Sequence, residues 1–151
     1  MRQGRRRRRR LPLRRWQPVA CQRRTVISQD DVCRAELPEP TGSGPGFRRP
    51  VVVVQGDALN RSRLARAACV PLASKLRWAD APGNVLLAAA ATGLPKDTVG
   101  NATQILALDR SLPEQRAGRI SPAWLDLLLA GIDTILGRHD HRRLRHVRAS
   151  R

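Results

Sequence analysis

Short apolar runs separated by turn-forming residues follow one another between residues 26 and 108. Residues 26–37 are predicted as a first strand, which Pro38 and Pro40 end because proline cannot donate to a strand ladder. Residues 51–54 are all valine, and such a β-branched run favours a strand that is buried on both faces. Further apolar runs lie at residues 67–72, 85–89 and 102–108. The series is typical of a small, mainly antiparallel barrel.

One amphipathic helix is predicted after these runs. Ser121 can cap its first turn, and Pro122 suits the first helical position, where no backbone N–H is needed. The apolar residues that follow recur at helical spacing and form one face: Leu125, Leu128, Leu129, Ile132, Ile135 and Leu136. Gly137 supplies the stop. Trp124 lies beside this stripe and is interpreted as a packing residue.

Length and charge divide the chain into one domain and two tails. The 151 residues allow a single domain with a hydrophobic core. Of the net charge of +17, residues 1–24 supply +11, residues 138–151 supply +5 and residues 25–137 only +1. We therefore expect a disordered, Arg-rich extension at 1–24, a folded domain at 25–137 and a basic tail at 138–151. The charge that would indicate a nucleic-acid partner lies almost entirely in the tails.

The Arg-rich extension has two open interpretations. It is either a basic arm that contacts phosphate groups, or the product of an arginine-biased genome or of a start codon assigned too early, since the chain has 27 arginines and two lysines. The three histidines, His139, His141 and His146, lie in the basic tail, where neighbouring arginines disfavour a metal dication. We expect these histidines to be solvated.

The residue types in the domain exclude several classes of enzyme. Residues 25–137 contain no histidine, so neither a Ser-His-Asp triad nor a paired-histidine ribonuclease site can be built there. Asp30 and Asp31 are adjacent but alternate faces in a regular strand, which disfavours a magnesium-dependent nuclease. Glycine-rich phosphate-binding motifs are absent from the sequence. We expect no metal and no cofactor.

Cysteine usage and hydropathy indicate the compartment. Cys21, Cys33 and Cys69 form no CxxC pair, and their odd number suits a reducing interior. The longest apolar segments fall well short of the roughly 20 residues that a membrane span requires. The Arg-rich start also lacks the apolar core of a secretory signal. We expect a bacterial cytoplasmic protein without a membrane partner.

A candidate site lies where a loop meets the valine strand. Residues 41–46 contain three glycines and a proline and predict a loop, in which Ser43 offers a hydroxyl. Phe47, Arg48 and Arg49 follow. A guanidinium group can donate two parallel hydrogen bonds to a phosphate, and an aromatic ring can stack a base. Successive strand residues face opposite ways, so only one arginine is expected to face the loop. The alternative is a solvated pair that ends a strand.

Three stretches resemble a known family when they are taken together. They read GSGPGFRRPVVVVQGDALNRS at 42–62, VPLASKLRWADAPGNVLL at 70–87 and ATGLPKDTVGNATQILALDRS at 91–111. In order and spacing they resemble the MazF/PemK family of toxin endoribonucleases. The resemblance implies a mainly β, α+β fold: a small SH3-like barrel of the MazF/CcdB toxin type with a C-terminal helix. It also implies a homodimer and a cognate antitoxin bound across an RNA groove.

The activity that the resemblance implies is growth inhibition by an mRNA interferase. Such an enzyme cleaves single-stranded RNA without a metal. The 2′-hydroxyl attacks the adjacent phosphate and leaves a cyclic phosphate and a 5′-hydroxyl. The active arginine of the family precedes the proline of the valine strand, which is Arg49 here. Its second active residue is usually a threonine, which Ala73 replaces, while the neighbouring hydroxyl of Ser74 is kept.

The remaining site residues also follow from the resemblance. The family loop often reads G-S-E-Q, and of these polar side chains the sequence keeps Ser43. Its first strand usually opens with Gly-Asp and aromatic residues, where this chain has an acid followed by Val32 and Cys33. By position in the family pattern, Lys75 and Gln104 are expected to contact RNA; the alternative is that they are surface residues at strand edges. The predicted catalytic residues are thus Arg49 and Ser74, and the predicted RNA-binding residues are Ser43, Phe47, Arg48, Lys75 and Gln104.

Three functional hypotheses follow. The leading one is a metal-independent endoribonuclease toxin. The second is a family member that binds RNA or antitoxin without cleaving, because loss of one positioned hydroxyl lowers a rate by about 10² to 10⁴. The third is a toxin that acts on a protein, as the related CcdB-type toxins act on DNA gyrase.

Overall fold

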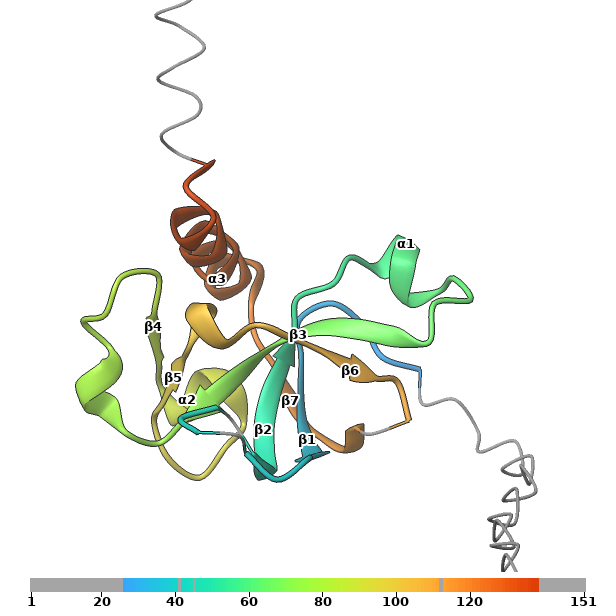
Figure 1. Cartoon of the computed structure of the whole chain (residues 1–151), viewed down its shortest axis with the longest axis horizontal. Coiled ribbons are helices and arrows are strands. Elements are labelled where there is room, and N and C mark those ends of the chain that lie inside the picture. Colours follow the sequence, from blue (N-terminus) through green and yellow to red (C-terminus); the bar gives the residue numbers. More distant parts are fainter. Residues whose placement is uncertain (1–25, 41, 45, 112, 139–151) are drawn as a thin grey trace, which may run out of the picture.

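The computed structural model describes residues 26–138 except 41, 45 and 112. A strongly curled antiparallel sheet forms the body of the protein, and one long helix packs across it (Figure 1). This mainly β, α+β architecture confirms the predicted fold class. The predicted extension at 1–24 and the three histidines lie outside the described residues. Within the described part, no helix is both long and apolar enough to span a membrane.

Seven strands follow the order β4-β5-β3-β2-β1-β7, with β6 also paired to β3. Their bounds are β1 Asp31–Leu37, β2 Phe47–Val53, β3 Arg66–Ala73, β4 Val85–Leu87, β5 Thr98–Gly100, β6 Leu106–Asp109 and β7 Pro113–Arg119. The α-helices are α1 Asp57–Asn60, α2 Ala89–Thr92 and α3 Pro122–Ile135, and two 3-10 turns are η1 Leu76–Trp78 and η2 Ala102–Gln104.

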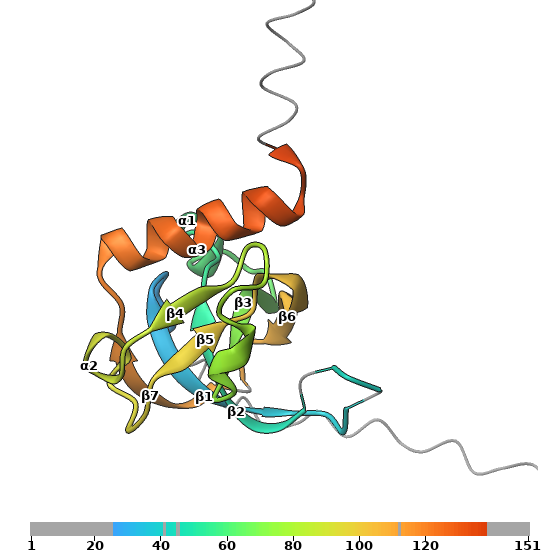
Figure 2. The same cartoon turned by 90° about the vertical axis from the view of Figure 1, so that its left-hand side faces the viewer.

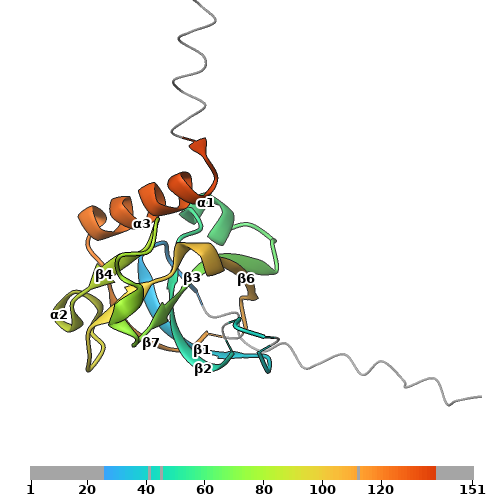
Figure 3. The same ribbon diagram turned by 60° about the vertical axis from the view of Figure 1, so that its left-hand side comes forward.

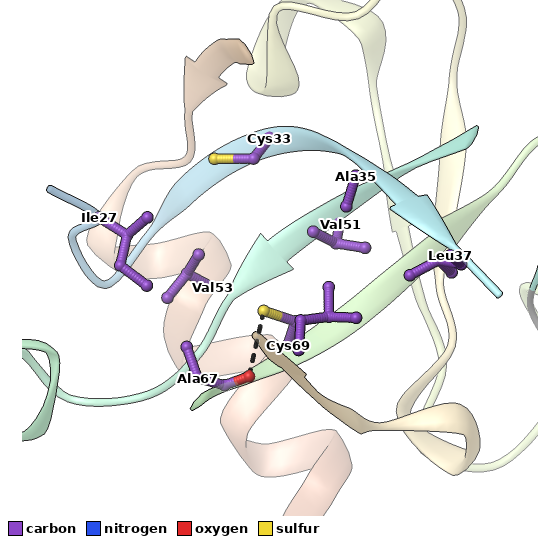
Figure 4. Packing of buried hydrophobic residues seen from close by; sticks show 9 residues of the cluster. Ile27, Cys33, Ala35, Leu37, Val51, Val53, Ala67 and Cys69 are labelled. Carbon is purple, nitrogen blue, oxygen red and sulfur yellow. Dashed lines mark hydrogen bonds between the residues drawn. The ribbon is translucent and has the colours of Figure 1, made fainter. Parts of the chain in front are cut away.

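The valine strand divides the hydrophobic core into two clusters. Val51 and Val53 point into one cluster with Cys33, Cys69 and Leu37 (Figure 4). Val52 and Val54 point into the second, which contains Leu72, Leu87 and Leu128. The first three valines have no exposed surface and Val54 is buried. This confirms the prediction that residues 51–54 are buried on both faces.

The first strand is shorter than predicted. Ile27 is buried, although Val26 before it is 86% exposed. Asp30, however, adopts a left-handed backbone with φ +77, so the chain turns there and β1 begins only at Asp31. The Asp30 backbone N–H then donates to the Val53 carbonyl oxygen at 2.9 Å. The prediction of a strand over 26–30 is therefore wrong.

Other elements differ from the apolar pattern for local reasons. The run at 85–89 is divided because the Ala89 backbone N–H donates to the Asp97 carboxylate, which starts α2. The run at 102–108 contains η2 and then β6. β7 has the mainly polar sequence PEQRAGR and lies at the sheet edge, paired with β1 through an irregular register. An edge strand needs little apolar surface, so the pattern misses it.

The long helix α3 begins and packs as predicted. The Ser121 hydroxyl accepts the Trp124 backbone N–H at 3.5 Å, and Gly137 takes the left-handed conformation after the last turn. Leu128 has no exposed surface, and α3 lies across the open side of the sheet above β4 and β5 (Figures 2 and 3). The end of the predicted stripe differs, because Leu136 is 61% exposed.

Close backbone approach holds α3 on the sheet. A Cβ atom on Gly131 of α3 would overlap the carbonyl oxygen of Gly83, the residue that precedes Asn84 and β4. A Cβ atom on Gly100 of β5 would lie 2.6 Å from Leu128 Cδ2. The contact at Gly131 requires glycine because the neighbouring atom belongs to the backbone, whereas a Cβ atom at Gly100 would displace the Leu128 side chain. The helix therefore fixes the position of the segment that enters β4.

Leu128→Ala should lower the free energy of unfolding by about 2 to 5 kcal/mol, because it leaves a cavity among Leu72, Leu87 and Gly100. The matched control is Leu127→Ala on the same helix, where the side chain is half exposed. We expect the control to change stability by no more than about 0.5 kcal/mol. Urea unfolding followed by circular dichroism measures both, and equal effects would contradict the packing described here.

Candidate functional site

The cavity of interest opens where two central strands separate. β2 pairs with β3 only from Val51, opposite Pro71, to Val53, opposite Cys69. Beyond Pro71, β3 leaves β2 and pairs with β5 through Leu72 and Ala73. If the pairing continued, Arg49 would lie opposite Ala73. Because it does not, both residues line a cavity of about 710 Å³ between the diverging strand ends.

Six of the seven predicted site residues line this cavity. Ser43 comes from the β1–β2 loop, Arg48 and Arg49 from β2, Ser74 and Lys75 from the segment after β3, and Gln104 from η2. Phe47 is not among the lining residues, although it is 63% exposed. The tertiary structure thus brings together residues that are up to 61 positions apart in the sequence.

Arg49 is half-buried and anchored by one nitrogen. Its Nε donates to the carbonyl oxygen of Gly46 in the β1–β2 loop at 3.3 Å. Within the part of the chain that the structure describes, its two terminal nitrogens make no hydrogen bond or ion pair. A guanidinium group held in this way can present both terminal nitrogens to a phosphate. The same hydrogen bond connects the β1–β2 loop to β2.

Arg48 reaches the same cavity as Arg49, although neighbouring strand residues ordinarily face opposite sides. Phe47 begins β2 with a left-handed φ of +58, so the start of the strand is irregular. Of the two arginines, Arg49 is the one whose hydrogen bond to the loop is defined. Only one arginine was expected to face the loop, and the cavity takes both side chains.

The opposite wall is the end of β3. Ala73 pairs with Val99 of β5 and presents a methyl group to the cavity, and the exposed Ser74 follows it. A serine hydroxyl can donate one hydrogen bond to a phosphate oxygen. The wall therefore retains one hydroxyl next to the position where the family carries threonine.

Two amides that hold the walls together were only partly foreseen from the sequence. Asn84 Nδ2 donates to the Trp78 carbonyl oxygen at 2.9 Å, and Asn84 Oδ1 accepts the Ala102 backbone N–H at 3.2 Å. Asn84 thereby connects η1 with η2. Gln104 Nε2 donates to the Ser43 carbonyl oxygen at 3.0 Å, so its described contact is with the loop.

Asn84, Trp78 and Arg77 line the cavity but were not among the predicted site residues. Asn84 follows Pro82 and Gly83 in a turn, where asparagine is common for local reasons. Its contact with Ala102 spans 18 residues, and nothing in the local sequence marks it. Trp78 lies in a short polar stretch whose pattern predicts no buried face.

The cavity is electropositive although the domain is nearly neutral. Arg48, Arg49, Lys75 and Arg77 line it, and no carboxylate is among the lining residues. Acidic groups are engaged elsewhere: the buried carboxylate of Asp31 accepts the Arg119 guanidinium at 3.2 Å. A concentration of one sign of charge in a recess attracts a polyanion.

The aspartates at the start of β1 are paired with arginines of β7. Asp31 also accepts the Ser28 backbone N–H at 2.9 Å, and Arg116 lies 3.6 Å from it. Burial raises the pKa of Asp30, and Arg119 opposes this rise. Among residues 26–138, as far as the structure describes them, no three histidine, cysteine or carboxylate side chains gather to hold an ion. The two aspartates fasten β1 to β7.

The family model for PemK-like, MazF-like toxins of type II toxin–antitoxin systems matches residues 28–136. The chain belongs to this family. The endoribonuclease MazF2 of Mycobacterium bovis is 38% identical over 111 residues, which cover 74% of this chain and 97% of that protein. The endoribonuclease MazF6 of Mycobacterium tuberculosis H37Rv matches over the same length with the same identity.

Solved structures confirm the fold of this MazF-like chain. The MazF crystal structure from Deinococcus radiodurans has a TM-score of 0.63 at 21% identity and covers 74% of this chain and 97% of its own. A mycobacterial endoribonuclease in complex with its cognate antitoxin has a TM-score of 0.55 at 22% identity and covers 75% and 95%. The SH3-like barrel of the MazF type with a C-terminal helix is therefore established.

Asn84→Ala should release η1 from η2. Loss of two side-chain hydrogen bonds lowers the free energy of unfolding by about 1 to 2 kcal/mol, since each contributes roughly 1 kcal/mol. Amide hydrogen exchange at Ala102 should accelerate. Asn84→Asp is the matched control because it keeps an acceptor for the Ala102 N–H, while the donor to Trp78 becomes a carboxylate oxygen that repels the Trp78 carbonyl oxygen. Unchanged exchange at Ala102 in Asn84→Ala would contradict the bridging role.

Proposed function

We propose that this protein is the toxin of a type II toxin–antitoxin system and cleaves single-stranded RNA without a metal ion, which inhibits growth. The observation that carries the proposal is the cavity itself, where Arg49 and the end of β3 meet among four cationic side chains. Membership of the MazF-like family supports the same reaction. The relatives named above are endoribonucleases.

The chemistry assigned to the cavity is transfer of an RNA phosphate to the neighbouring 2′-oxygen. The 2′-oxygen forms a bond to phosphorus, the bond to the 5′-oxygen breaks, and the products carry a 2′,3′-cyclic phosphate and a 5′-hydroxyl. Negative charge builds on the phosphate oxygens as phosphorus becomes five-coordinate. The terminal nitrogens of Arg49 stabilise that charge, and the Ser74 hydroxyl donates to the same group. The proton lost by the 2′-hydroxyl balances the proton gained by the leaving 5′-oxygen.

Lys75 and Arg48 hold the flanking phosphates in this proposal, and Ser43 and Gln104 keep the β1–β2 loop against η2. Phe47 is assigned to the rim, beside the cavity and not in it. We further infer a homodimer, a cognate antitoxin as protein partner and a cytoplasmic location in a bacterium. The mycobacterial neighbour in complex with its antitoxin supports the second of these.

Arg49→Ala should lower the rate of RNA cleavage at least about 10²-fold, the usual cost of removing one donor to a developing oxyanion. The assay uses the full chain, an unstructured RNA oligonucleotide and excess EDTA, and mass spectrometry identifies the cyclic phosphate. The matched control is Arg63→Ala, which removes the same charge from an exposed position outside the cavity. Cleavage by Arg49→Ala at the rate of the unaltered chain would refute the mechanism.

A second function, RNA binding without cleavage, is favoured by the methyl group of Ala73 in the wall of the cavity. Ala73→Thr separates the two functions. If the chain is an enzyme that lacks one hydroxyl, this substitution should raise the rate by about 10² to 10⁴. Ala73→Val is the matched control, since it adds the same shape without a hydroxyl. Cleavage that appears only in Ala73→Thr would identify the natural chain as a binding protein.

A further inference from the structure

An exposed aromatic ring lies inside the cavity, and the proposed reaction as described so far makes no use of it. Trp78, the last residue of η1, lines the same recess as Arg49 and Lys75 and is 48% exposed. About half of the Trp78 surface is in water, so a planar partner that covers it would remove further apolar surface from water. Such a ring at the wall of a charged recess is the arrangement by which proteins hold unpaired bases.

We propose that Trp78, backed by Arg77, is the base-stacking subsite of the cavity and holds one unpaired base of the RNA next to the scissile phosphate. This inference rests on the proposed function and adds the chemical group that the cavity recognises beside the phosphate. Phe47, for which the sequence predicts stacking, is not among the residues that line the cavity.

The backbone beneath Trp78 is fixed, which a stacking platform requires. Its N–H donates to the Lys75 carbonyl oxygen at 3.3 Å, and its own carbonyl oxygen accepts Asn84 Nδ2 at 2.9 Å. Asn84 is in turn bound to Ala102 of η2. A ring mounted on a backbone with these restraints loses little freedom when a base stacks on it, so more of the stacking energy appears as affinity.

The Arg77 guanidinium lies over one face of the Trp78 ring. Its guanidinium carbon lies 5.2 Å from the centroid of the Trp78 ring, within the range of a cation–π contact. One face is thereby covered by a positive group, so in this proposal the base stacks on the opposite face. Arg77 itself lines the cavity, so a phosphate next to the stacked base meets a charge as well. Stacking of this kind tolerates any base, because every base has a π-face.

The charge of the recess favours RNA over a protein partner as the occupant. Four cationic side chains and no carboxylate line it together with Trp78. A nucleic acid carries one phosphate and one base in every nucleotide. The phosphate can bind an arginine while the neighbouring base stacks on an aromatic ring. A protein contact through Trp78 would need acidic side chains placed to match Arg49 and Lys75, whereas RNA supplies a phosphate at every nucleotide.

Binding of an RNA that cannot be cut tests this subsite separately from catalysis. The probe is a fluorescein-labelled, fully 2′-O-methylated oligonucleotide of mixed sequence, whose blocked 2′-oxygens prevent cleavage. Trp78→Ala should weaken its affinity for the full-length protein roughly five- to 100-fold, the usual range for removal of one stacked ring. Trp78→Phe keeps an aromatic face and should recover most of the loss. Thermal unfolding checks that each variant is folded.

A double-mutant cycle, which combines Trp78→Ala with removal of one base from the probe, tests whether stacking causes the loss of affinity. At one position of the oligonucleotide, removal of the base should weaken binding to the unaltered protein and have no effect on Trp78→Ala. Leu86→Ala is the matched control, since Leu86 is equally exposed at 46% but lies on β4 outside the cavity lining. It should leave the affinity within about twofold.

The possible failures are distinguishable. If the unaltered protein does not bind the oligonucleotide, both the proposed function and the stacking subsite are overturned. If it binds equally well with Trp78→Ala, only the subsite is overturned, and the exposed ring is then assigned to a protein contact. If Phe47→Ala weakens binding and Trp78→Ala does not, stacking belongs to the rim of the cavity.

Discussion

The burial of β2 on both faces is the constraint on which the rest of the structure depends. Its valines fill two hydrophobic clusters at once, so the strand cannot slide without exposing apolar surface on one side or the other. The strand is therefore fixed along its length as well as in its register. Arg49 and Pro50 occupy the end where burial stops. Arg49 is held at the cavity because the valines behind it cannot move.

The cavity exists because β2 and β3 stop pairing before either strand ends. Their ladder ends at Val51 and Pro71, next to Pro50, which has no N–H to donate, while β3 continues to Ala73 paired with β5 on its other edge. The helix α3 supports the far wall through the contact between Gly131 and Gly83. Asn84 follows Gly83 and joins η1 to η2. A continuous set of contacts thus runs from the core to the residues that meet the ligand.

The sequence was informative wherever one segment carried a complete local signal. The valine run, the capped helix at Ser121 and the glycine-rich loop each combine pattern and turn chemistry in a few residues, and the structure has each of them. It was less informative for β7, whose polar edge position needs no apolar face, and for residues 26–30, where a buried Ile27 precedes a turn. In both segments the conformation is determined by contacts with the rest of the fold and not by the local preferences of the residues.

The identity of the proposed phosphate-binding arginine was determined by the sequence itself, because Arg49 adjoins Pro50 and the valine run within one short segment. Which other residues line the cavity with Arg49 was determined by the tertiary structure. Trp78 and Asn84 come from a stretch without a strong hydrophobic pattern, and both line the cavity that opens where β3 separates from β2. The close contact between Gly131 of α3 and Gly83 fixes the backbone next to Asn84. Side-chain contacts between distant segments depend on the whole packed core, which no local stretch of sequence encodes.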